Sequence, residues 1–284
     1  MVGLDKEIKE LFLKQQHEWY KFIPALFEIV KELKGHTLDI LSSKLEETKF
    51  GVRYFFAGTI DYLKKHLDAM SISDGTKLIN LYRSIAHLKG NIPIFTYALS
   101  ERKSDPRYIQ FDKEFVDLID GFDLVFDIDS PLKNVTDAWG VAKQIKVILD
   151  EYKVPYYVKS SGTRGFHFII PYNYMPEINP LELQAIHYKV LRNIGAIYEW
   201  SDYIDKSVAS HPKTLIKCSY AFDSANISLP MNDIEFENFS PEKIKMEWVL
   251  DNIILKNRGL LTRTYGLSEE ELKKNVKKFL DDFK

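Results

Sequence analysis

The segment Phe122-Asp-Leu-Val-Phe-Asp-Ile-Asp129 carries the clearest structural signal in the chain. Its apolar residues are typical of a buried β-strand that ends in two aspartates at positions i and i+2. Because successive side chains of a strand point to opposite faces, Asp127 and Asp129 would lie on one face. Two adjacent carboxylates repel each other unless a cation lies between them, and Mg²⁺ or Mn²⁺ prefers such oxygen ligands. The pair predicts a metal site, unless these aspartates only cap the turn before Pro131.

A second segment, Lys159-Ser-Ser-Gly-Thr-Arg-Gly-Phe-His167, lies between the apolar runs Tyr156–Val158 and Phe166–Ile170. The two runs and the glycine-containing turn predict a β-hairpin. The turn contains groups that can bind phosphate, namely accessible backbone amides, a hydroxyl and two cationic side chains. These groups belong to Gly162, Gly165, Ser161, Arg164 and His167. We predict a triphosphate-binding turn; the alternative is an ordinary hairpin turn with incidental polar residues.

A third acidic residue is expected if a second metal ion is to be bridged. Asp205, in Tyr203-Ile-Asp205, lies next to a potential strand, although Asp202 and Asp223 compete for the role. A lone aspartate is also common as a turn or cap residue. The sequence therefore proposes Asp205 as the third ligand and leaves a purely structural role open.

The apolar patterns divide the chain into three regions. Residues 1–90 are predicted to be mainly helical, because apolar residues recur every three or four positions, for example from Leu78 to Leu88. Residues 91–240 show short apolar runs separated by single helices, which predicts an α+β core. Residues 241–284 are predicted to return to helix. Since no linker separates these regions, we expect one domain with helical ends.

Several elements have recognisable ends. Asn134 is predicted to cap a helix over residues 135–151, and a Ser268-x-x-Glu271 capping box predicts the start of the last helix. Near residue 220, the runs 215–217 and 227–229 are predicted to form a strand pair.

Composition limits the protein classes that fit. The chain has 284 residues, enough for a substantial core, and 39 Lys+Arg against 41 Asp+Glu, so any polyanion would meet a local basic patch. The single cysteine, Cys218, excludes an internal disulfide and a structural zinc site built on cysteine pairs. No stretch resembles a signal peptide or a membrane span. We expect a cytoplasmic protein, nucleoid-associated in a prokaryote, with no membrane partner.

Taken together, FDLVFDID, SSGTRGFH and YID resemble, in order, the three motifs of the archaeo-eukaryotic primase superfamily. This superfamily includes primase small catalytic subunits, primase-polymerases and the polymerase domains of bacterial repair ligases. The resemblance covers roughly residues 91–235. It implies an α+β fold, with a primase-type catalytic core of mixed sheets, RRM-like in part, and flanking helices. It also implies a template-dependent nucleotidyltransferase of DNA replication or repair, acting as a primase or a DNA/RNA polymerase.

The resemblance also implies roles for individual residues. Two divalent ions, Mg²⁺ or Mn²⁺, would be held by Asp127, Asp129 and Asp205. The phosphates of the incoming nucleotide would be held by Ser161, Arg164 and His167, and by Lys217 in the segment Leu215–Phe222. The implied partners are an NTP or dNTP and a single-stranded or primed DNA template, and a primase large subunit is a further candidate.

The chain departs from the family at two positions. Asp223 stands where many members have a histidine, and Thr163 stands where eukaryotic-type small subunits often have an arginine. Two other functions stay open: a haloacid-dehalogenase-like phosphatase with Asp127 as nucleophile, and a non-catalytic nucleotide-binding subunit of a primase complex. The first leaves SSGTRGFH without a role. The second gives no reason to retain three acids that repel one another.

Contacts to nucleic acid are expected from basic side chains and from tyrosines that can stack on bases. The candidates near the motifs are Lys143, Lys146, Lys153, Lys159, Arg192, Lys206, Tyr156, Tyr157, Tyr172 and Tyr174. The alternative for each is a solvated lysine or arginine, or a tyrosine packed in a strand.

Overall fold

The computed structural model describes most of the chain after residue 115 and several segments before it. The described residues are 14–16, 18–20, 22–44, 49–55, 60–61, 63–64, 67, 77–89, 95–98, 116–223, 226–252 and 262–284. The helices are α2 (Ile23–Glu32), α5 (Val135–Glu151), α6 (Pro180–Ile197), α7 (Asp233–Glu237), α8 (Met246–Asn252) and α9 (Glu269–Phe283). Short 3₁₀ helices are η1 (Val116–Leu118), η2 (Tyr172–Tyr174), η3 (Lys206–Ala209) and η4 (Pro241–Ile244).

The strands complete a mixed α+β fold. They are β1 (Thr37–Lys44), β2 (Lys49–Phe55), β3 (Lys77–Ser84), β4 (Ala86–Leu88), β5 (Phe95–Ala98), β6 (Ile119–Phe122), β7 (Leu124–Asp129), β8 (Tyr157–Ser160), β9 (Gly165–Ile170), β10 (Leu215–Lys217), β11 (Phe222–Asp223), β12 (Asn226–Ile227) and β13 (Pro230–Met231). No helix among the described residues is both long and apolar enough to cross a membrane.

The first of the two main sheets is antiparallel, in the order β10-β3-β1-β2-β5. Strand β10 follows β3 by more than a hundred residues in sequence, yet it joins the edge of this sheet with Lys217 opposite Tyr82 and Ile216 opposite Arg83. The region after residue 90 therefore shares a sheet with the region before it. This pairing brings a late segment of the chain against the first sheet.

The helix predicted from Leu78 to Leu88 is wrong, because these residues form strands β3 and β4. In β3, Leu81 and Arg83 are buried on one face, and Tyr82 points the other way into a pocket. A strand that is covered on both faces carries apolar residues at irregular spacings, which here imitate the period of a helix. The described part of residues 1–90 contains four strands as well as α2 and shorter helical stretches within 14–20 and 60–67, so it is not mainly helical.

The second main sheet has the order β13-β8-β9-β7 and contains the predicted hairpin, β8 with β9. One of its faces carries the buried side chains Phe126, Phe166 and Phe168, which belong to the main core with the buried stripe of α5. The opposite face carries a row of directly paired residues, Asp127 with His167 and His167 with Lys159. The polar row therefore lies on the face turned away from the aromatic core.

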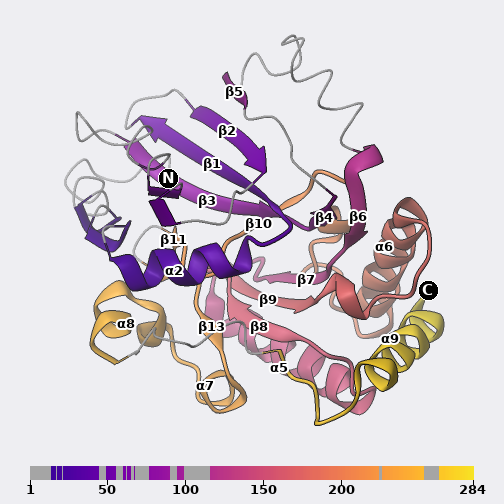
Figure 1. Ribbon diagram of the computed structural model, residues 1–284. Helices are drawn as coiled ribbons and strands as arrows, with labels where there is room; N and C mark the ends of the chain where they lie inside the picture. The colour runs from indigo at the N-terminus through magenta and orange to yellow at the C-terminus, as the bar shows by residue number, and fades with distance from the viewer. Residues whose placement is uncertain are drawn as a thin grey trace.

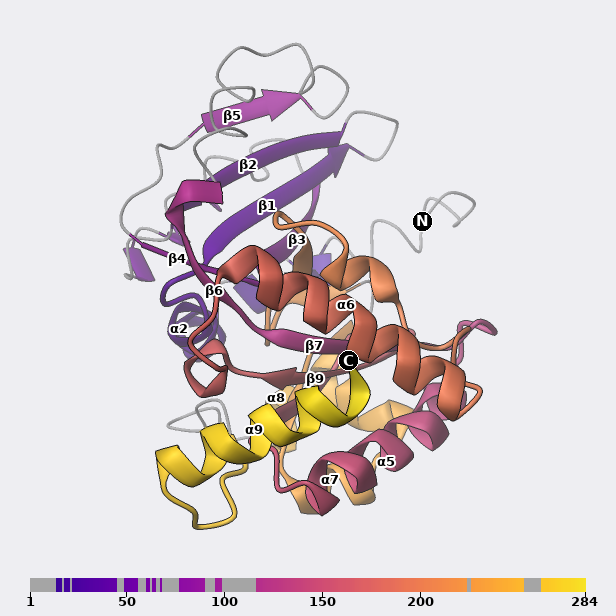
Figure 2. The same ribbon diagram turned by 90° about the vertical axis from the view of Figure 1, so that its right-hand side faces the viewer.

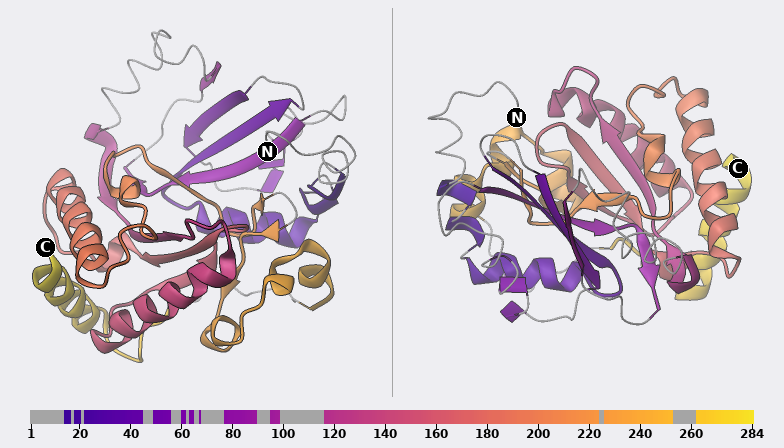
Figure 3. Two further views of the ribbon diagram at one scale, coloured as in Figure 1. Left: turned by 180° about the vertical axis from the view of Figure 1, so that it is seen from behind. Right: turned by 90° about the horizontal axis from the view of Figure 1, so that it is seen from above.

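The two sheets and the helices are arranged in layers. The first sheet lies against the polar face of the second, and helices α5, α6 and α9 cover the other side (Figures 2 and 3). Between the sheets lies a smaller apolar cluster that includes Val125, Tyr157, Ile169 and Ile216. Helix α2 runs along the junction of the two sheets (Figure 1). The polar row is thus enclosed between the sheets.

The predicted helix ends are confirmed. Asn134 accepts a hydrogen bond from the Thr136 amide at the start of α5, and Ser268 and Glu271 form the capping box of α9. The predicted pairing of runs 215–217 and 227–229 is wrong. The first run pairs with β3, whereas Ile227 pairs with Phe222 in the hairpin of β11 and β12. Each run had the composition of a strand, but composition does not specify which strand pairs with it.

Candidate active site

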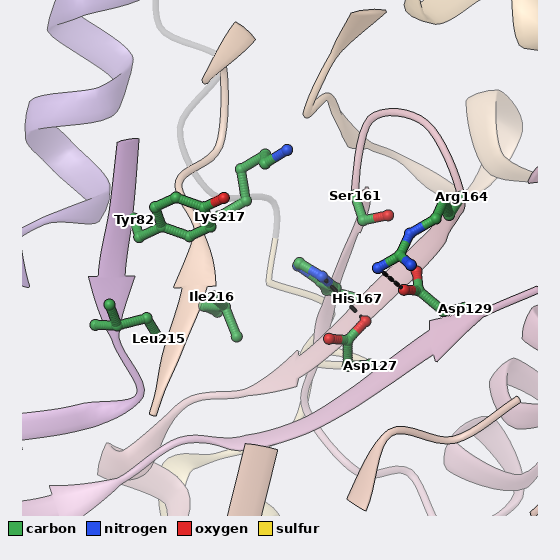
Figure 4. A pocket seen from close by; sticks show the side chains of 9 residues that line it. All are labelled: Tyr82, Asp127, Asp129, Ser161, Arg164, His167, Leu215, Ile216 and Lys217. Atoms are coloured by element: carbon green, nitrogen blue, oxygen red, sulfur yellow. Dashed lines mark ion pairs between the residues drawn. The ribbon is translucent and has the colours of Figure 1, made fainter. Parts of the chain in front are cut away.

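A pocket lies where the two sheets meet (Figure 4). Its walls come from β3 and β10 of the first sheet, and from β7, β9 and the β8–β9 turn of the second. The lining residues are Tyr82, Asp127, Asp129, Ser161, Arg164, His167, Leu215, Ile216 and Lys217. Residues from three segments that are far apart in sequence are thereby brought together. Among the predicted metal-binding and phosphate-binding residues, Gly162, Gly165 and Asp205 are not part of the lining.

The two aspartates of β7 point into this pocket from one face of the strand (Figure 4). Oδ1 of Asp127 is buried and accepts no hydrogen bond from the described residues. Nε2 of His167 lies 3.3 Å from this oxygen, an ion-pair distance without hydrogen-bond alignment, and it carries a charge only when the imidazole is protonated. A buried carboxylate oxygen that lacks a donor is costly unless a ligand supplies one.

Asp129 is held by a more exposed partner. Nη2 of Arg164 lies 2.5 Å from its Oδ2, and the Arg164 side chain is 55% exposed. Burial and the adjacent charge of Asp127 raise the pKa of the Asp129 carboxyl, Arg164 and His167 oppose this, and Asp205 adds to it. Because an exposed ion pair contributes only about 0–1 kcal/mol, Arg164 can leave Asp129 at little cost. The charge on Asp129 is therefore incompletely compensated in the protein alone.

The β8–β9 turn is built around two glycines. The Ser161 amide donates to the Gly165 carbonyl at 2.8 Å, and the Gly165 amide donates to Ser161 Oγ at 3.1 Å. Gly162 has φ +108°, a backbone conformation that residues with a Cβ atom rarely adopt. At Gly165, a Cβ atom would lie 1.7 Å from the carbonyl oxygen of Ile128. The turn therefore brings Ser161 and Arg164 close to β7 only because glycine occupies these positions.

Asp205 is attached to the same strand through its backbone. Its amide donates to the Asp127 carbonyl at 2.9 Å, and the Asp129 amide donates to the Tyr203 carbonyl at 2.9 Å. The Asp205 carboxylate, however, accepts from the Ser207 amide at 2.8 Å and caps η3. The segment that contains the third motif is thus placed beside Asp127 and Asp129, while its carboxylate serves as a cap.

The donor set can be compared with what a divalent cation requires. Asp127 and Asp129 place two carboxylates on one face. Asp127 has a buried oxygen that lacks a donor, and the pKa of the Asp129 carboxyl is raised. This pair of oxygen ligands fits a divalent cation. Among the described residues, no group of three His, Cys, Asp or Glu side chains is arranged to hold a metal ion. The pair can accept the ion once Arg164 releases Asp129, whereas Asp205 would have to give up its capping bond to join it.

Tyr82 and Lys217 form the wall opposite the aspartates (Figure 4). They are directly paired across β3 and β10, and the Lys217 ammonium lies 6.0 Å from the centre of the Tyr82 ring. Sequence reasoning missed Tyr82, because it placed residues 78–88 in a helix. If these residues had been predicted as a strand, Tyr82 and Arg83 would have been placed on opposite faces. The position of Tyr82 in the pocket still depends on the pairing of β3 with β10, which the sequence does not specify.

Several predicted nucleic-acid contacts are buried. Tyr156, Tyr157 and Lys159 are at most 3% exposed, so they cannot contact an external strand in this structure. Lys146 is engaged by Asp150, with 3.0 Å between charged atoms. The alternative of a tyrosine packed in a strand is confirmed for Tyr157 in β8, and Tyr156 is packed in the same way from the bridge residue just before that strand.

No protein-family model matches the chain, and the search of curated proteins found no match.

Proposed function

We propose that the protein is a template-dependent nucleotidyltransferase of the archaeo-eukaryotic primase type, which joins NTPs or dNTPs on a single-stranded or primed DNA template. The observation that supports this is the convergence of FDLVFDID, SSGTRGFH and β10 on one pocket, which combines paired carboxylates with phosphate-binding groups. Such a combination suits transfer of a nucleotidyl group, because charge on the phosphates must be neutralised while the reacting oxygens are held in line.

In this proposal, the triphosphate is bound by the pocket residues of β9, β10 and the β8–β9 turn. Arg164, His167 and Lys217 donate to the β- and γ-phosphates, and the Ser161 hydroxyl contacts a phosphate oxygen. Arg164 exchanges Asp129 for phosphate, which its exposed position permits. The turn at Gly162 lets backbone amides approach the same oxygens. These contacts orient the α-phosphate towards the carboxylate pair and screen the negative charge of the leaving group.

The carboxylates orient the attacking group. Asp127 and Asp129 would hold divalent ions, with Asp205 as the third candidate ligand. Mg²⁺ or Mn²⁺ bound there would lower the pKa of the attacking 3′-hydroxyl and neutralise the departing pyrophosphate. The Asp127 oxygen that lacks a donor and the Asp129 charge are the groups of this chain that such binding would satisfy.

The first test is removal of the carboxylate pair. Asp127→Ala/Asp129→Ala is expected to abolish incorporation of nucleotides on a primed or unprimed single-stranded template in Mn²⁺ or Mg²⁺, with the fold intact by circular dichroism. The matched control is Asp281→Ala/Asp282→Ala on α9, away from the pocket, which should retain activity. Incorporation by the pocket variant would contradict the proposal. Phosphate release from a simple phosphate ester without incorporation would instead favour the phosphatase.

A further inference from the structure

Behind the pocket wall lies a second group of charges, which we call the buried charge cluster: Glu32, Arg83, Asp123 and Lys159. Nζ of Lys159 lies 3.1 Å and Nε of Arg83 lies 3.2 Å from Glu32 Oε1, and Arg83 Nη1 lies 2.9 Å from Asp123 Oδ2. All four residues are at most 4% exposed. The cluster joins α2, β3, the start of β7 and β8. It holds two positive and two negative charges, so its formal charges balance.

Two members of this cluster hold the backbone just after β10. Lys159 Nζ donates to the carbonyl of Lys217, and Glu32 Oε2 accepts from the amide of Ser219. The peptide groups on either side of Cys218 are thus anchored to α2 and β8 by charged side chains. Lys217 itself lines the pocket.

Position in the sheet links the cluster to the pocket. Lys159 stands directly opposite His167, and His167 stands directly opposite Asp127, so the three form one row across β8, β9 and β7. The end of this row nearest β7 opens into the pocket, and the other end is sealed by Glu32 and the Lys217 carbonyl. The anchoring contacts therefore lie on the same face as the aspartates.

Stability alone gives a weak reason for such an arrangement. Moving ions from water into a protein interior is costly, and replacing a buried ion pair by apolar side chains of similar volume is often neutral or stabilising. Strand β10 is short, since only Leu215–Lys217 pair with β3. A short edge strand has few backbone hydrogen bonds to fix its position, so side-chain contacts to its end can set where Lys217 lies.

We propose that Glu32 and Lys159 are positioning residues that hold the end of β10, and with it the Lys217 side chain, at the distance from Asp127 and Asp129 that a nucleoside triphosphate requires. This inference rests on the proposed function, because it takes Lys217 as a phosphate ligand. Neither residue touches the nucleotide. Their effect is transmitted through the backbone of Lys217–Ser219.

The test is a double-mutant cycle read by equilibrium binding of a deoxynucleoside triphosphate in Mn²⁺, measured by calorimetry. Lys159→Met is expected to raise Kd at least fivefold in the otherwise unchanged protein and to have less than a twofold effect in a Lys217→Met background. A role in stability alone would weaken binding by the same factor in both backgrounds, and that outcome would overturn the proposal. Lys277→Met, which removes an exposed lysine of α9 outside the pocket, should leave Kd unchanged.

A second variant keeps the test decisive if Lys159→Met folds poorly. Glu32→Gln/Lys159→Met removes one charge of each sign, so the remaining Arg83 and Asp123 still balance, and its melting temperature should recover relative to either single variant. Its Kd should nevertheless stay raised, because the donor to the Lys217 carbonyl is absent. A wild-type Kd in this variant would refute the positioning role.

The outcomes also separate this inference from the proposed function. If the wild-type protein binds triphosphate but incorporates none, the proposed function fails and the cycle still tests the positioning role. If the wild-type protein binds no triphosphate, the inference fails as well.

Discussion

The pocket and the buried charge cluster use the same kinds of side chain in opposite ways. In the cluster, Glu32 faces two cationic side chains and a backbone amide. Burial alone would raise the pKa of the Glu32 carboxyl, but the charges of Lys159 and Arg83 and the Ser219 amide bring it down to about 2. In the pocket, the pKa of the Asp129 carboxyl is raised and Asp127 has an oxygen without a donor.

This difference shows which charges serve the fold and which are available to a ligand. A carboxylate whose partners are complete contributes to stability in the protein alone, whereas one whose partners are incomplete lowers it until a cation or a donor arrives. The two groups lie on one face of one sheet, joined by the row from Asp127 to Lys159. Mutations in the two groups should therefore change stability in opposite directions.

The largest effect on stability is expected from Arg83→Met. Arg83 is 1% exposed and contacts Glu32, Asp123 and the Tyr157 hydroxyl, the last at 2.7 Å. Its removal leaves buried carboxylates short of a partner, which should lower the free energy of unfolding by about 3–5 kcal/mol. Urea denaturation measures this change.

The control for Arg83→Met is Lys277→Met, which removes an exposed ion pair to Asp281 on α9. An exposed pair of this kind contributes about 0.3–0.5 kcal/mol. If both substitutions had similar small effects, the buried carboxylates of Glu32 and Asp123 would not depend on Arg83 as a partner, contrary to their contacts.

A smaller loss is expected from Gly165→Ala. The added methyl group would meet the Ile128 carbonyl, a backbone atom that cannot move without disturbing the pairing of Asp129 with Gly165. Crowding of this kind costs about 1–3 kcal/mol, and it would also shift Asp129 relative to the turn. The free energy of unfolding, measured by urea denaturation, and the rate of nucleotide incorporation should both decline.

Gly140→Ala is the matched control for this glycine. Gly140 lies within α5, where a Cβ would meet nothing within 4 Å. Alanine is favoured over glycine inside a helix by about 0.5–1 kcal/mol, so this variant should be slightly more stable and fully active. A loss of stability in both variants would indicate that glycine content, and not the approach to Ile128, matters.

The sequence predicted strand β7 and the β8–β9 hairpin of the second sheet, because their signals are local, but it did not predict strand β13. The period of two in Phe122–Asp129 fixes which side chains share a face, and glycines at positions 162 and 165 mark a hairpin turn. Helix caps such as Asn134 are equally local. Each of these features depends on residues only a few positions apart, so it can be deduced without knowing the rest of the fold.

The first sheet and half of the pocket could not be predicted in the same way. Strand β10 pairs with β3 across more than a hundred residues, and nothing in either segment specifies the other. Residues 78–88 have apolar residues on both faces, and their spacing matches a helix until the pairing with β1 and β10 is known. Tyr82 and the role of Lys159 as a buried anchor follow from this pairing, so both were missed.

The smallest effect, and the one of opposite sign, is expected from Asp129→Asn. The folded-state pKa of Asp129 is raised, so its charged form destabilises the protein, and removal of the charge should raise the melting temperature. For a chain of this size, a stability change of about 1 kcal/mol corresponds to about 2–4 °C, so a rise in melting temperature of a few degrees at most is expected. The loss of the exposed Arg164 pair opposes the gain only weakly.

The difference in melting temperature between Asp129→Asn and the wild type should depend on pH and on metal, and this dependence identifies its cause. The advantage of Asp129→Asn should be complete above the raised pKa, decline as the pH falls through it, and vanish below the ordinary value of 3.8, where both folded and unfolded wild-type chains bind the proton. Added Mn²⁺ should raise the melting temperature of the wild type more than that of the variant, since only the wild type keeps both carboxylates. Scanning calorimetry at several pH values, with and without Mn²⁺, measures both trends. If the variant were less stable than the wild type at neutral pH, Asp129 would belong with Glu32 among the carboxylates whose partners are complete, and the contrast between the pocket and the buried charge cluster would fail.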